Sequence, residues 1–314
     1  MPVSLRRLPP RPAMVEPRRQ LARLALALEQ WLEAALVAFV LAGFRLIPLD
    51  AASRLGGFLC RTFGPLLPVS RAALANLRRA FPEKSEAELK RILLAMWDNL
   101  GRTVGEYPHL ARFRLYEPGS RVEVIGAEHV DRLRDDGKTG LFFSAHIGNW
   151  ELASMGATQR GLPLARFYRA PNNPFVDRIV RLVRSPIAGE LLPKGAAGAR
   201  RGLAVMRAGG HIGMLVDQKM NDGIAVPFFG RDAMTAPALA QLALRFDCPV
   251  VPAKVERLEG AHFRLTVYPP LEIERTGDRQ GDIFRLMTRV NALVEEWVRA
   301  RPEQWLWVHN RWPE

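Results

Sequence analysis

A histidine and a glutamate stand five positions apart in the segment His146-Ile-Gly-Asn-Trp-Glu151. A carboxylate that accepts the Nδ1–H of an imidazole fixes its tautomer and stabilises the imidazolium. The Nε2 atom can then remove a proton from a hydroxyl, an effect of about 10²- to 10⁴-fold on a rate. The pair is therefore a candidate general base, in which a substrate alcohol replaces the serine of a Ser-His-Asp arrangement. Taken alone, such a pair is more often a structural hydrogen bond.

The surrounding residues predict how this pair is positioned. An apolar strand is expected over Leu141–Ser144, directly before His146. Gly148 and Asn149 permit a tight turn into a helix, whose first turn contains Glu151. This geometry is expected to fold the carboxylate back onto the imidazole.

The sequence after Pro118 alternates short β-type runs with helical patterns, which predicts an α/β core with a largely parallel central sheet flanked by helices. Ligands bind at the carboxyl ends of the strands in such folds. Strands are expected over 122–125, 141–144, 165–168, 212–216, 250–255 and 263–268, and helices over 127–134, 150–160, 173–183, 197–208, 237–246 and 281–301.

Three segments are expected before the core, which is placed at residues 118–314. Residues 1–20 form a flexible basic arm, 21–49 a membrane-anchoring helix and 50–117 a helical preamble packed on the core. Within the preamble, Ser85-Glu-Ala-Glu88 predicts a capping box that opens a long helix.

The anchor contains an uncharged run over 34–44, which Glu33 and Arg45 limit to less than the ~20 residues of a spanning helix. Basic residues flank it on both sides, which favours an interfacial or re-entrant anchor on the cytoplasmic face over a crossing helix. The alternative is an amphipathic helix buried against the domain.

Other motifs accompany the His/Glu pair. They are Tyr168-Arg-Ala-Pro-Asn-Asn-Pro174, Asp217-Gln-Lys219, Val226-Pro-Phe-Phe-Gly230, Thr235-Ala-Pro237, Trp305-Leu-Trp-Val-His-Asn-Arg-Trp312, and in the preamble Asn76 to Leu89 and Trp97 to Arg102. This ordered set resembles the bacterial lipid A biosynthesis acyltransferases, the late lauroyl and myristoyl transferases, within the wider His-x4-Asp/Glu acyltransferase superfamily. The resemblance spans about residues 20–314.

The resemblance implies an O-acyltransferase in which His146 is the general base and Glu151 its orienting partner. Arg169, just after a strand, is then expected to bind a substrate phosphate or the thioester oxyanion; the alternative is a surface salt bridge. Asp217 and Gln218 end a strand and are expected to face the same cleft, holding the acceptor or His146. Lys219 adds positive charge for phosphate. Asp217 is also compatible with a helix cap or a loop acid.

The remaining motifs have ambiguous roles. Thr235 and Pro237 open a helix whose free amides suit an anion, although ordinary capping explains them equally. The apolar run 226–230 either borders an acyl channel or packs in the core. The carboxyl-terminal tryptophans are assigned no catalytic role because such residues usually pack in cores or at interfaces.

Composition and spacing exclude several other classes. The 45 Lys and Arg against 32 Asp and Glu give a net charge of +13, which attracts polyanions. No nucleic-acid-binding motif is found. The six histidines lack metal-site spacing, and Ser144 lacks a nucleophile elbow. Neither a metal nor another cofactor is therefore expected, and direct acyl transfer in a ternary complex remains.

The expected partners follow from the family and the charge. The donor is an acyl-acyl carrier protein or acyl-CoA, the acceptor an anionic glycolipid, and the location the cytoplasmic face of the inner membrane; nucleic acid is not expected. One alternative is acylation of another lysolipid or glycolipid. A different class is a non-catalytic peripheral protein that binds anionic lipid.

Overall fold

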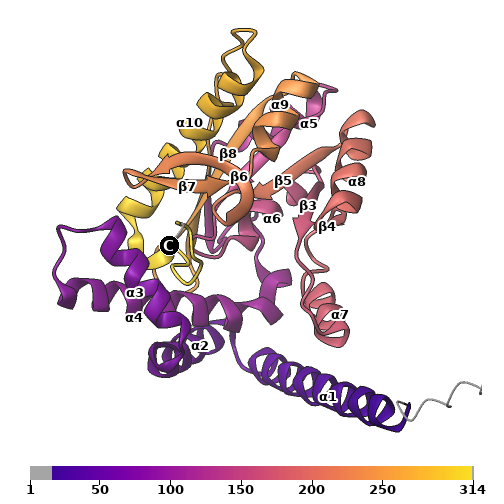
Figure 1. The fold of residues 1–314 in the computed structure, drawn as a ribbon, viewed down its shortest axis with the longest axis vertical. Coiled ribbons are helices and arrows are strands. Elements are labelled where there is room, and N and C mark those ends of the chain that lie inside the picture. The colour runs from indigo at the N-terminus through magenta and orange to yellow at the C-terminus, as the bar shows by residue number, and fades with distance from the viewer. Residues whose placement is uncertain (1–15, 313–314) are drawn as a thin grey trace, which may run out of the picture.

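The computed structural model describes residues 16–312 (Figure 1). Residues 1–15 of the expected basic arm lie outside the described residues, and residues 16–20 begin the first helix. Before the sheet, the described chain forms α1 (Glu16–Leu46), α2 (Leu49–Phe63), α3 (Val69–Ala80) and α4 (Glu86–Glu106), with 3₁₀ segments η1 (Gly64–Leu66) and η2 (Tyr107–Arg112). Ser85 and Glu88 form the capping box that was predicted at the start of α4.

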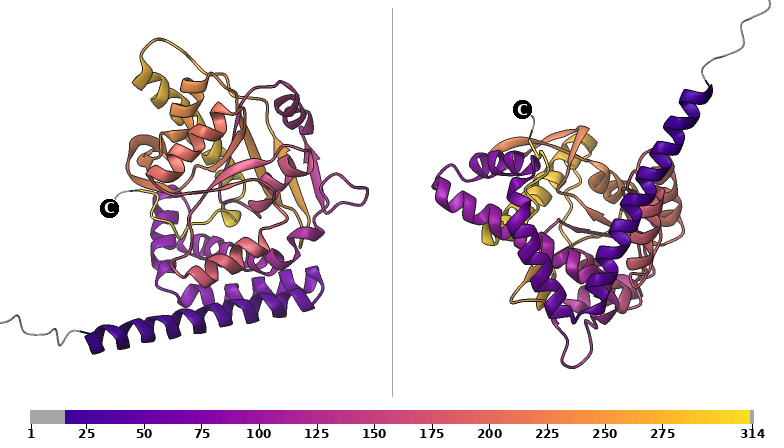
Figure 2. Two further views of the ribbon diagram at one scale, coloured as in Figure 1. Left: turned by 90° about the vertical axis from the view of Figure 1, so that its right-hand side faces the viewer. Right: turned by 90° about the horizontal axis from the view of Figure 1, so that it is seen from below.

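Helix α1 is exposed along most of its length. It lies along α7 (Pro174–Val183), and its amino-terminal part projects beyond the body (Figures 1 and 2). The stretch Leu21–Leu46 is long and apolar enough to cross a bilayer, with a mean hydropathy of 1.8, and 6% of its apolar window is buried. The alternative of a buried core helix is therefore wrong. Glu33, which interrupts the apolar run, accepts a hydrogen bond from Asn173 Nδ2 (2.8 Å).

The preamble is held together by a close crossing of α2 and α4. At this crossing, a Cβ added to Gly101 would lie 2.1 Å from Gly56 O, and one added to Gly105 would lie 2.3 Å from Ala52 O. Only glycine permits this approach of two backbones. The opposite side of α2 and the adjoining η1 leave apolar side chains exposed, among them Phe58 (64% exposed) and Phe63 (58%).

The core contains a seven-stranded sheet in the order β1-β9-β8-β2-β5-β3-β4. Its strands are β1 (Val122–Ile125), β2 (Leu141–Ser144), β3 (Leu164–Tyr168), β4 (Leu191–Pro193), β5 (His211–Leu215), β8 (Val250–Arg257) and β9 (Phe263–Val267). The connecting helices are α5 (Ala127–Asp135), α6 (Glu151–Gln159), α7, α8 (Ala196–Arg207), α9 (Ala238–Phe246) and α10 (Arg279–Ala300), followed by η3 (Pro302–Gln304). The predicted α/β fold with a largely parallel sheet is confirmed.

The pairing of β8 with β9 is the antiparallel exception. These strands are joined by a short connection, whereas the parallel pairs are joined by longer crossovers. Strands β2, β3, β4, β5 and β8 run parallel to one another, so their carboxyl ends share one edge of the sheet.

Strands β6 (Lys219–Phe228) and β7 (Arg231–Thr235) form a separate antiparallel hairpin that was not predicted. Phe229 and Gly230, both with positive φ, make its turn. Phe228 and Phe229 are buried against Trp305, Trp307 and Trp312. Val226, Phe228 and Phe229 of the apolar run 226–230 therefore pack in the core.

Candidate functional site

His146 lies at the carboxyl edge of the sheet, two residues after β2. The chain then reverses at Gly148, whose φ is 58°, and enters α6 at Glu151. A side chain is excluded at Gly148 because an added Cβ would lie 2.6 Å from Val255 O. The predicted strand, turn and helix are all present.

The imidazole of His146 is hydrogen-bonded to Asp217, which lies two residues after the end of β5. His146 Nδ1 lies 2.8 Å from Asp217 Oδ1, and the His146 backbone N–H donates to Asp217 Oδ2 (2.8 Å). Burial alone would raise the pKa of Asp217, but the charge and hydrogen bonds of His146 and a bond from Trp305 hold this pKa well below its usual range. An ionised Asp217 requires the proton on Nδ1, which leaves Nε2 as an acceptor.

Trp305 supports this pair from the carboxyl-terminal segment. Its indole N–H donates to Asp217 Oδ2 (2.7 Å), and its backbone forms a bridge with Ile147. The next residue, Leu306, donates its N–H to His146 O (3.2 Å). The sequence analysis assigned Trp305 no catalytic role. The one available signal was that a buried indole N–H needs a hydrogen-bond acceptor.

Gln218 and His309 face the free nitrogen of His146. The Gln218 amide nitrogen lies 3.4 Å from His146 Nε2 and 3.2 Å from His309 Nε2. Burial lowers the pKa of His309; the charges of His146, Lys194 and Arg169 also lower it, and the Asp217 carboxylate opposes them. Gln218 is where it was predicted, whereas His309 was missed because nothing in the sequence brings it near His146.

Glu151 does not make the expected hydrogen bond to His146. Its carboxylate instead accepts from Tyr107 Oη (2.8 Å) and pairs with Arg184 beyond the end of α7. Burial and the Glu151 charge raise the pKa of Tyr107 above its usual value. The structure therefore corrects the partner of Nδ1 from Glu151 to Asp217, because the helix directs Glu151 toward Tyr107 and Arg184.

The predicted basic residues are distributed around this edge. Arg169 is exposed one residue after β3. Lys194 follows β4, and the pairing of Tyr168 with Pro193 places it beside Arg169. Neither forms an ion pair within residues 16–312. Lys219 opens β6 and pairs in register with Thr235, away from a direct contact with His146.

The Thr235 hydroxyl is hydrogen-bonded within the protein. It is buried and accepts a hydrogen bond from Arg311 Nη2 (2.8 Å), and the Arg311 guanidinium is itself fully buried. Burial lowers the pKa of Arg311 to about 10. Thr235 therefore satisfies a buried cation of the carboxyl-terminal segment.

A pocket with a volume of about 80 Å³ lies near the pair, although neither His146 nor Asp217 lines it. Its wall includes Ser144, two residues before His146, and Leu215, two residues before Asp217. Glu151, Arg166 and Arg184 contribute the charged part. The apolar part is formed by Phe142, Phe143, Trp150, Ala153, Leu164, Phe167, Leu191, Met214 and Ala253. Among residues 16–312, no group of three or more His, Cys, Asp or Glu side chains is placed to hold a metal ion.

An oriented histidine with a free Nε2, at the edge of a parallel sheet and beside an apolar pocket, suits acyl transfer to an alcohol. The match of a family model confirms this class. The chain belongs to the bacterial lipid A biosynthesis acyltransferase family, whose model matches residues 19–314.

Individual relatives agree with the family. The chain is 28% identical over 242 residues to the lipid A biosynthesis myristoyltransferase of Escherichia coli, covering 76% of this chain and 73% of that protein. It is 26% identical over 249 residues to the lipid A biosynthesis lauroyltransferase of the same organism, covering 75% and 76%. A phosphatidylinositol mannoside acyltransferase of Mycolicibacterium smegmatis is 22% identical over 247 residues, covering 77% and 78%.

Proposed function

We propose that this acyltransferase moves a fatty acyl chain from a carrier thioester to a hydroxyl of a lipid A precursor, with His146 as the general base. The observation that carries the mechanism is the hydrogen bond between His146 Nδ1 and the buried Asp217, which leaves Nε2, beside the Gln218 amide, as the acceptor. The family and the lipid A relatives support the acceptor.

In the proposed reaction, His146 Nε2 removes the proton of the acceptor hydroxyl as its oxygen attacks the thioester carbonyl carbon. The ionised Asp217 stabilises the resulting imidazolium. Collapse of the tetrahedral intermediate breaks the C–S bond, and the imidazolium returns the proton to the leaving thiolate. Gln218 vacates Nε2 for the hydroxyl, and its amide N–H groups are then available to the oxyanion.

The pocket is proposed to hold the acyl chain, because it is mostly apolar and its wall includes Ser144 and Leu215, which precede His146 and Asp217 by two residues each. Glu151 lines this pocket. Its bonds to Tyr107 and Arg184 join α6 to η2 and to the end of α7. We infer that loss of this carboxylate impairs turnover by loosening the pocket wall.

The basic residues at the sheet edge are proposed to receive phosphates of the substrates. Arg169 and Lys194 stand side by side without acidic partners among the described residues, and Lys219 lies at the start of the nearby hairpin. The net charge of +13 would steer an acidic carrier protein to the enzyme, and acyl-CoA also carries phosphates.

We place the enzyme at the cytoplasmic face of the inner membrane. Helix α1 supports membrane attachment through its length and exposed apolar surface. The exposed side of α2, which includes Phe58 and Phe63, adds a second apolar surface on the preamble. Arg54 and Arg61, exposed on the same helix, suit anionic lipid.

The test is an acyl-transfer assay on the full chain in detergent. Wild type, His146→Ala and Glu151→Gln are incubated with lauroyl and myristoyl donors, on carrier protein or CoA, and a tetraacylated lipid A precursor, and products are identified by mass spectrometry. One added acyl mass from wild type and none from His146→Ala is expected, with reduced transfer by Glu151→Gln. Equal activity of wild type and His146→Ala would contradict the mechanism.

A second candidate acceptor is another glycolipid, favoured by the similarity to the mannoside acyltransferase. Under this alternative, the wild type acylates a different lipid in an acceptor panel and leaves the lipid A precursor unchanged. His146→Ala is inactive in that case too, so the assay separates acceptor from mechanism.

A further inference from the structure

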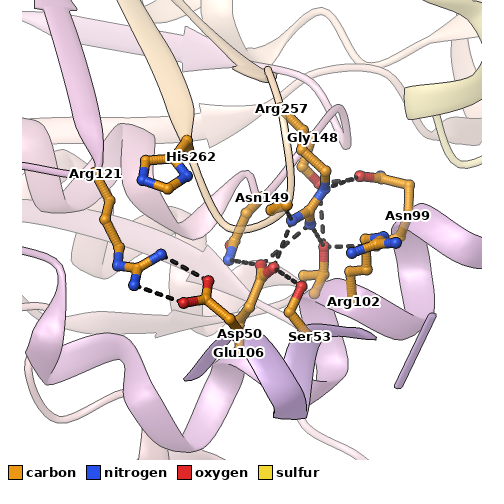
Figure 3. Close-up of polar contacts among 12 residues, drawn as sticks. Asp50, Ser53, Asn99, Arg102, Glu106, Arg121, Gly148, Asn149, Arg257 and His262 are labelled. Carbon is orange, nitrogen blue, oxygen red and sulfur yellow. Dashed lines mark hydrogen bonds and ion pairs between the residues drawn. The ribbon is translucent and has the colours of Figure 1, made fainter. Parts of the chain in front are cut away.

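A buried polar network joins the helical preamble to the turn that follows His146 (Figure 3). At its centre is Glu106, the last residue of α4, which is 0% exposed. Arg257, at the end of β8, binds both oxygens of this carboxylate. Ser53 Oγ donates to Oε1 (2.7 Å), and Asn149 Nδ2 donates to Oε2 (3.0 Å). Residues of α2, α4, β8 and the catalytic turn, residues 146–151, thus meet at one carboxylate.

Helix α4 also holds the turn directly, through Gly148. Asn99 Nδ2 donates to Gly148 O (3.3 Å), and the Thr103 hydroxyl lies at the same distance from that oxygen. Arg257 Nε in turn donates to Asn99 Oδ1 (2.8 Å), and its Nη2 donates to Thr103 Oγ1 (3.2 Å). Arg257 therefore orients the groups of α4 that face the turn.

The other backbone groups of the turn are fixed from different directions. The Gly148 N–H donates to Gln304 O (3.1 Å), His146 N–H to Asp217, and His146 O accepts from Leu306. All backbone polar groups of His146 and Gly148 are thus bonded to distant segments. The preamble supplies the partners of Gly148 O and of the Asn149 side chain.

We propose that Glu106 is a positioning residue for the acyl-transfer reaction, acting through Asn149 and, by way of Arg257, through Gly148. The helical preamble then does more than attach the enzyme to a membrane, because it sets the position of the base relative to the pocket. This inference rests on the proposed role of His146. A displacement of about 1 Å of a reacting group can lower a rate about 10²-fold.

The same interface provides a matched control. Arg121, just before β1, makes a bidentate ion pair with Asp50 in the first turn of α2 (2.7 and 2.8 Å) (Figure 3). This pair also joins the preamble to the core, but it makes no contact with residues 146–151 in the described chain. Asp50→Asn therefore weakens the attachment of the preamble without altering the catalytic turn.

The experiment compares wild type, Glu106→Gln, Asn149→Ala, the double variant and Asp50→Asn in the acyl-transfer assay. It is run at a temperature at which circular dichroism shows each variant folded. We expect kcat to fall by about 10- to 10²-fold in Glu106→Gln and Asn149→Ala, with KM for the donor unchanged. Asp50→Asn should keep the wild-type kcat and lose only thermal stability.

The double variant tests whether the two residues act together. If Glu106 acts through Asn149, the double variant should be little slower than the slower single variant, because coupled residues are not additive. Should Glu106→Gln fail to fold, Asn149→Ala alone carries the test, since it leaves the Glu106–Arg257 pair in place.

The experiment distinguishes failure of the proposed function from failure of the positioning role alone. If His146→Ala, assayed in parallel, is as active as wild type, the proposed function itself fails. If His146→Ala is inactive while Glu106→Gln and Asn149→Ala keep the kcat of Asp50→Asn, only the positioning role is overturned.

Discussion

At the scale of single residues, the pairing of His146 with Asp217 differs from a surface ion pair because Asp217 is 4% exposed and fully hydrogen-bonded. Its three bonds, from the His146 backbone and ring and from Trp305, all favour the ionised form. A fixed carboxylate of this kind keeps the imidazole in one tautomer. The proposed base is therefore oriented before any substrate binds.

Replacing Asp217 by Asn tests this organisation. The amide keeps an oxygen near Nδ1 but cannot stabilise an imidazolium by charge, so we expect kcat to fall by roughly 10²- to 10⁴-fold. The measurement is the steady-state rate of acyl transfer, with folding checked by circular dichroism. Asp222→Asn, at an exposed position of β6, is the control and should be unaffected. An unchanged rate in Asp217→Asn would contradict the assignment.

His309 predicts a pH dependence of stability. Its pKa is lowered by burial in the folded state, whereas an unfolded histidine has a pKa of about 6.5. Below that pH the unfolded chain binds a proton that the folded chain does not, so stability is present at pH 7 and falls as the pH drops. Burial also lowers the pKa of His109 and His211, which act in the same direction.

We therefore expect His309→Gln to reduce the loss of stability between about pH 7 and pH 5 without abolishing it. Urea unfolding at several pH values measures the slope. His262→Gln, at an exposed position, serves as the control. A slope in His309→Gln as steep as that of wild type would refute the prediction.

At the scale of elements, the close approach of the α2 and α4 backbones, and not helix propensity, decides which residue is stable at their crossing. Alanine stabilises an isolated helix by about 1 kcal/mol relative to glycine. At Gly101, however, the new Cβ would meet Gly56 O at 2.1 Å and Cys60 Cβ at 2.6 Å. The two helices would have to separate to accommodate one methyl group.

Gly101→Ala should therefore destabilise the protein by about 1–3 kcal/mol, the usual range for overpacking. Gly43→Ala in α1 is the matched control, because nothing lies within 4 Å of its added Cβ. Thermal unfolding in detergent compares the two. If Gly101→Ala unfolded at the same temperature as Gly43→Ala, the close crossing would not hold in solution.

The pocket formed by β2, β3, β5 and α6 predicts how a substitution would change the preference for acyl chain length. Ala153 on α6 lines it, and leucine at this position would occupy part of its space. Ala153→Leu should lower kcat/KM for long acyl donors more than for short ones, measured by competition between donors of increasing chain length. Ala199→Leu, exposed on α8, should leave the preference unchanged.

At the scale of the whole molecule, the exposed apolar surfaces of α1 and of α2 with η1 lie at one end, whereas the amino-terminal part of α10 lies at the other (Figures 1 and 2). The sheet edge with His146 faces the preamble, which stands between the core and the proposed membrane surface. The arrangement suits an acyltransferase that takes a lipid substrate from a bilayer.

Phe58→Asp should weaken binding of the full chain to anionic vesicles, because it places a charge on the exposed side of α2. Phe284→Asp is the control, since Phe284 is 43% exposed on α10, away from this surface. Vesicle co-sedimentation measures binding, and activity on detergent-dispersed acceptor should stay constant in both variants. Equal vesicle binding by the two variants would argue against α2 as a membrane contact.

The sequence by itself determined the α/β fold, the capping box of α4 and the family. Such features depend on local periodicity, turn residues and ordered motifs, which survive without knowledge of distant contacts. The sequence also placed His146, Asp217 and Gln218 at the ends of predicted strands. The hairpin of β6 and β7 was missed because Lys219–Phe228 mixes polar, glycine and proline residues without the alternation of a strand.

Only the tertiary structure decided which carboxylate accepts the hydrogen bond of the His146 imidazole. Glu151 is five positions from His146 and Asp217 is 71 positions away, yet the parallel pairing of β2 with β5 brings Asp217 to the imidazole. The positions of Trp305, His309 and Glu106 around His146 and its turn could not be predicted for the same reason. Hydrogen-bond partners at the edge of a parallel sheet come from segments far apart in the chain, so spacing along the sequence does not reveal them.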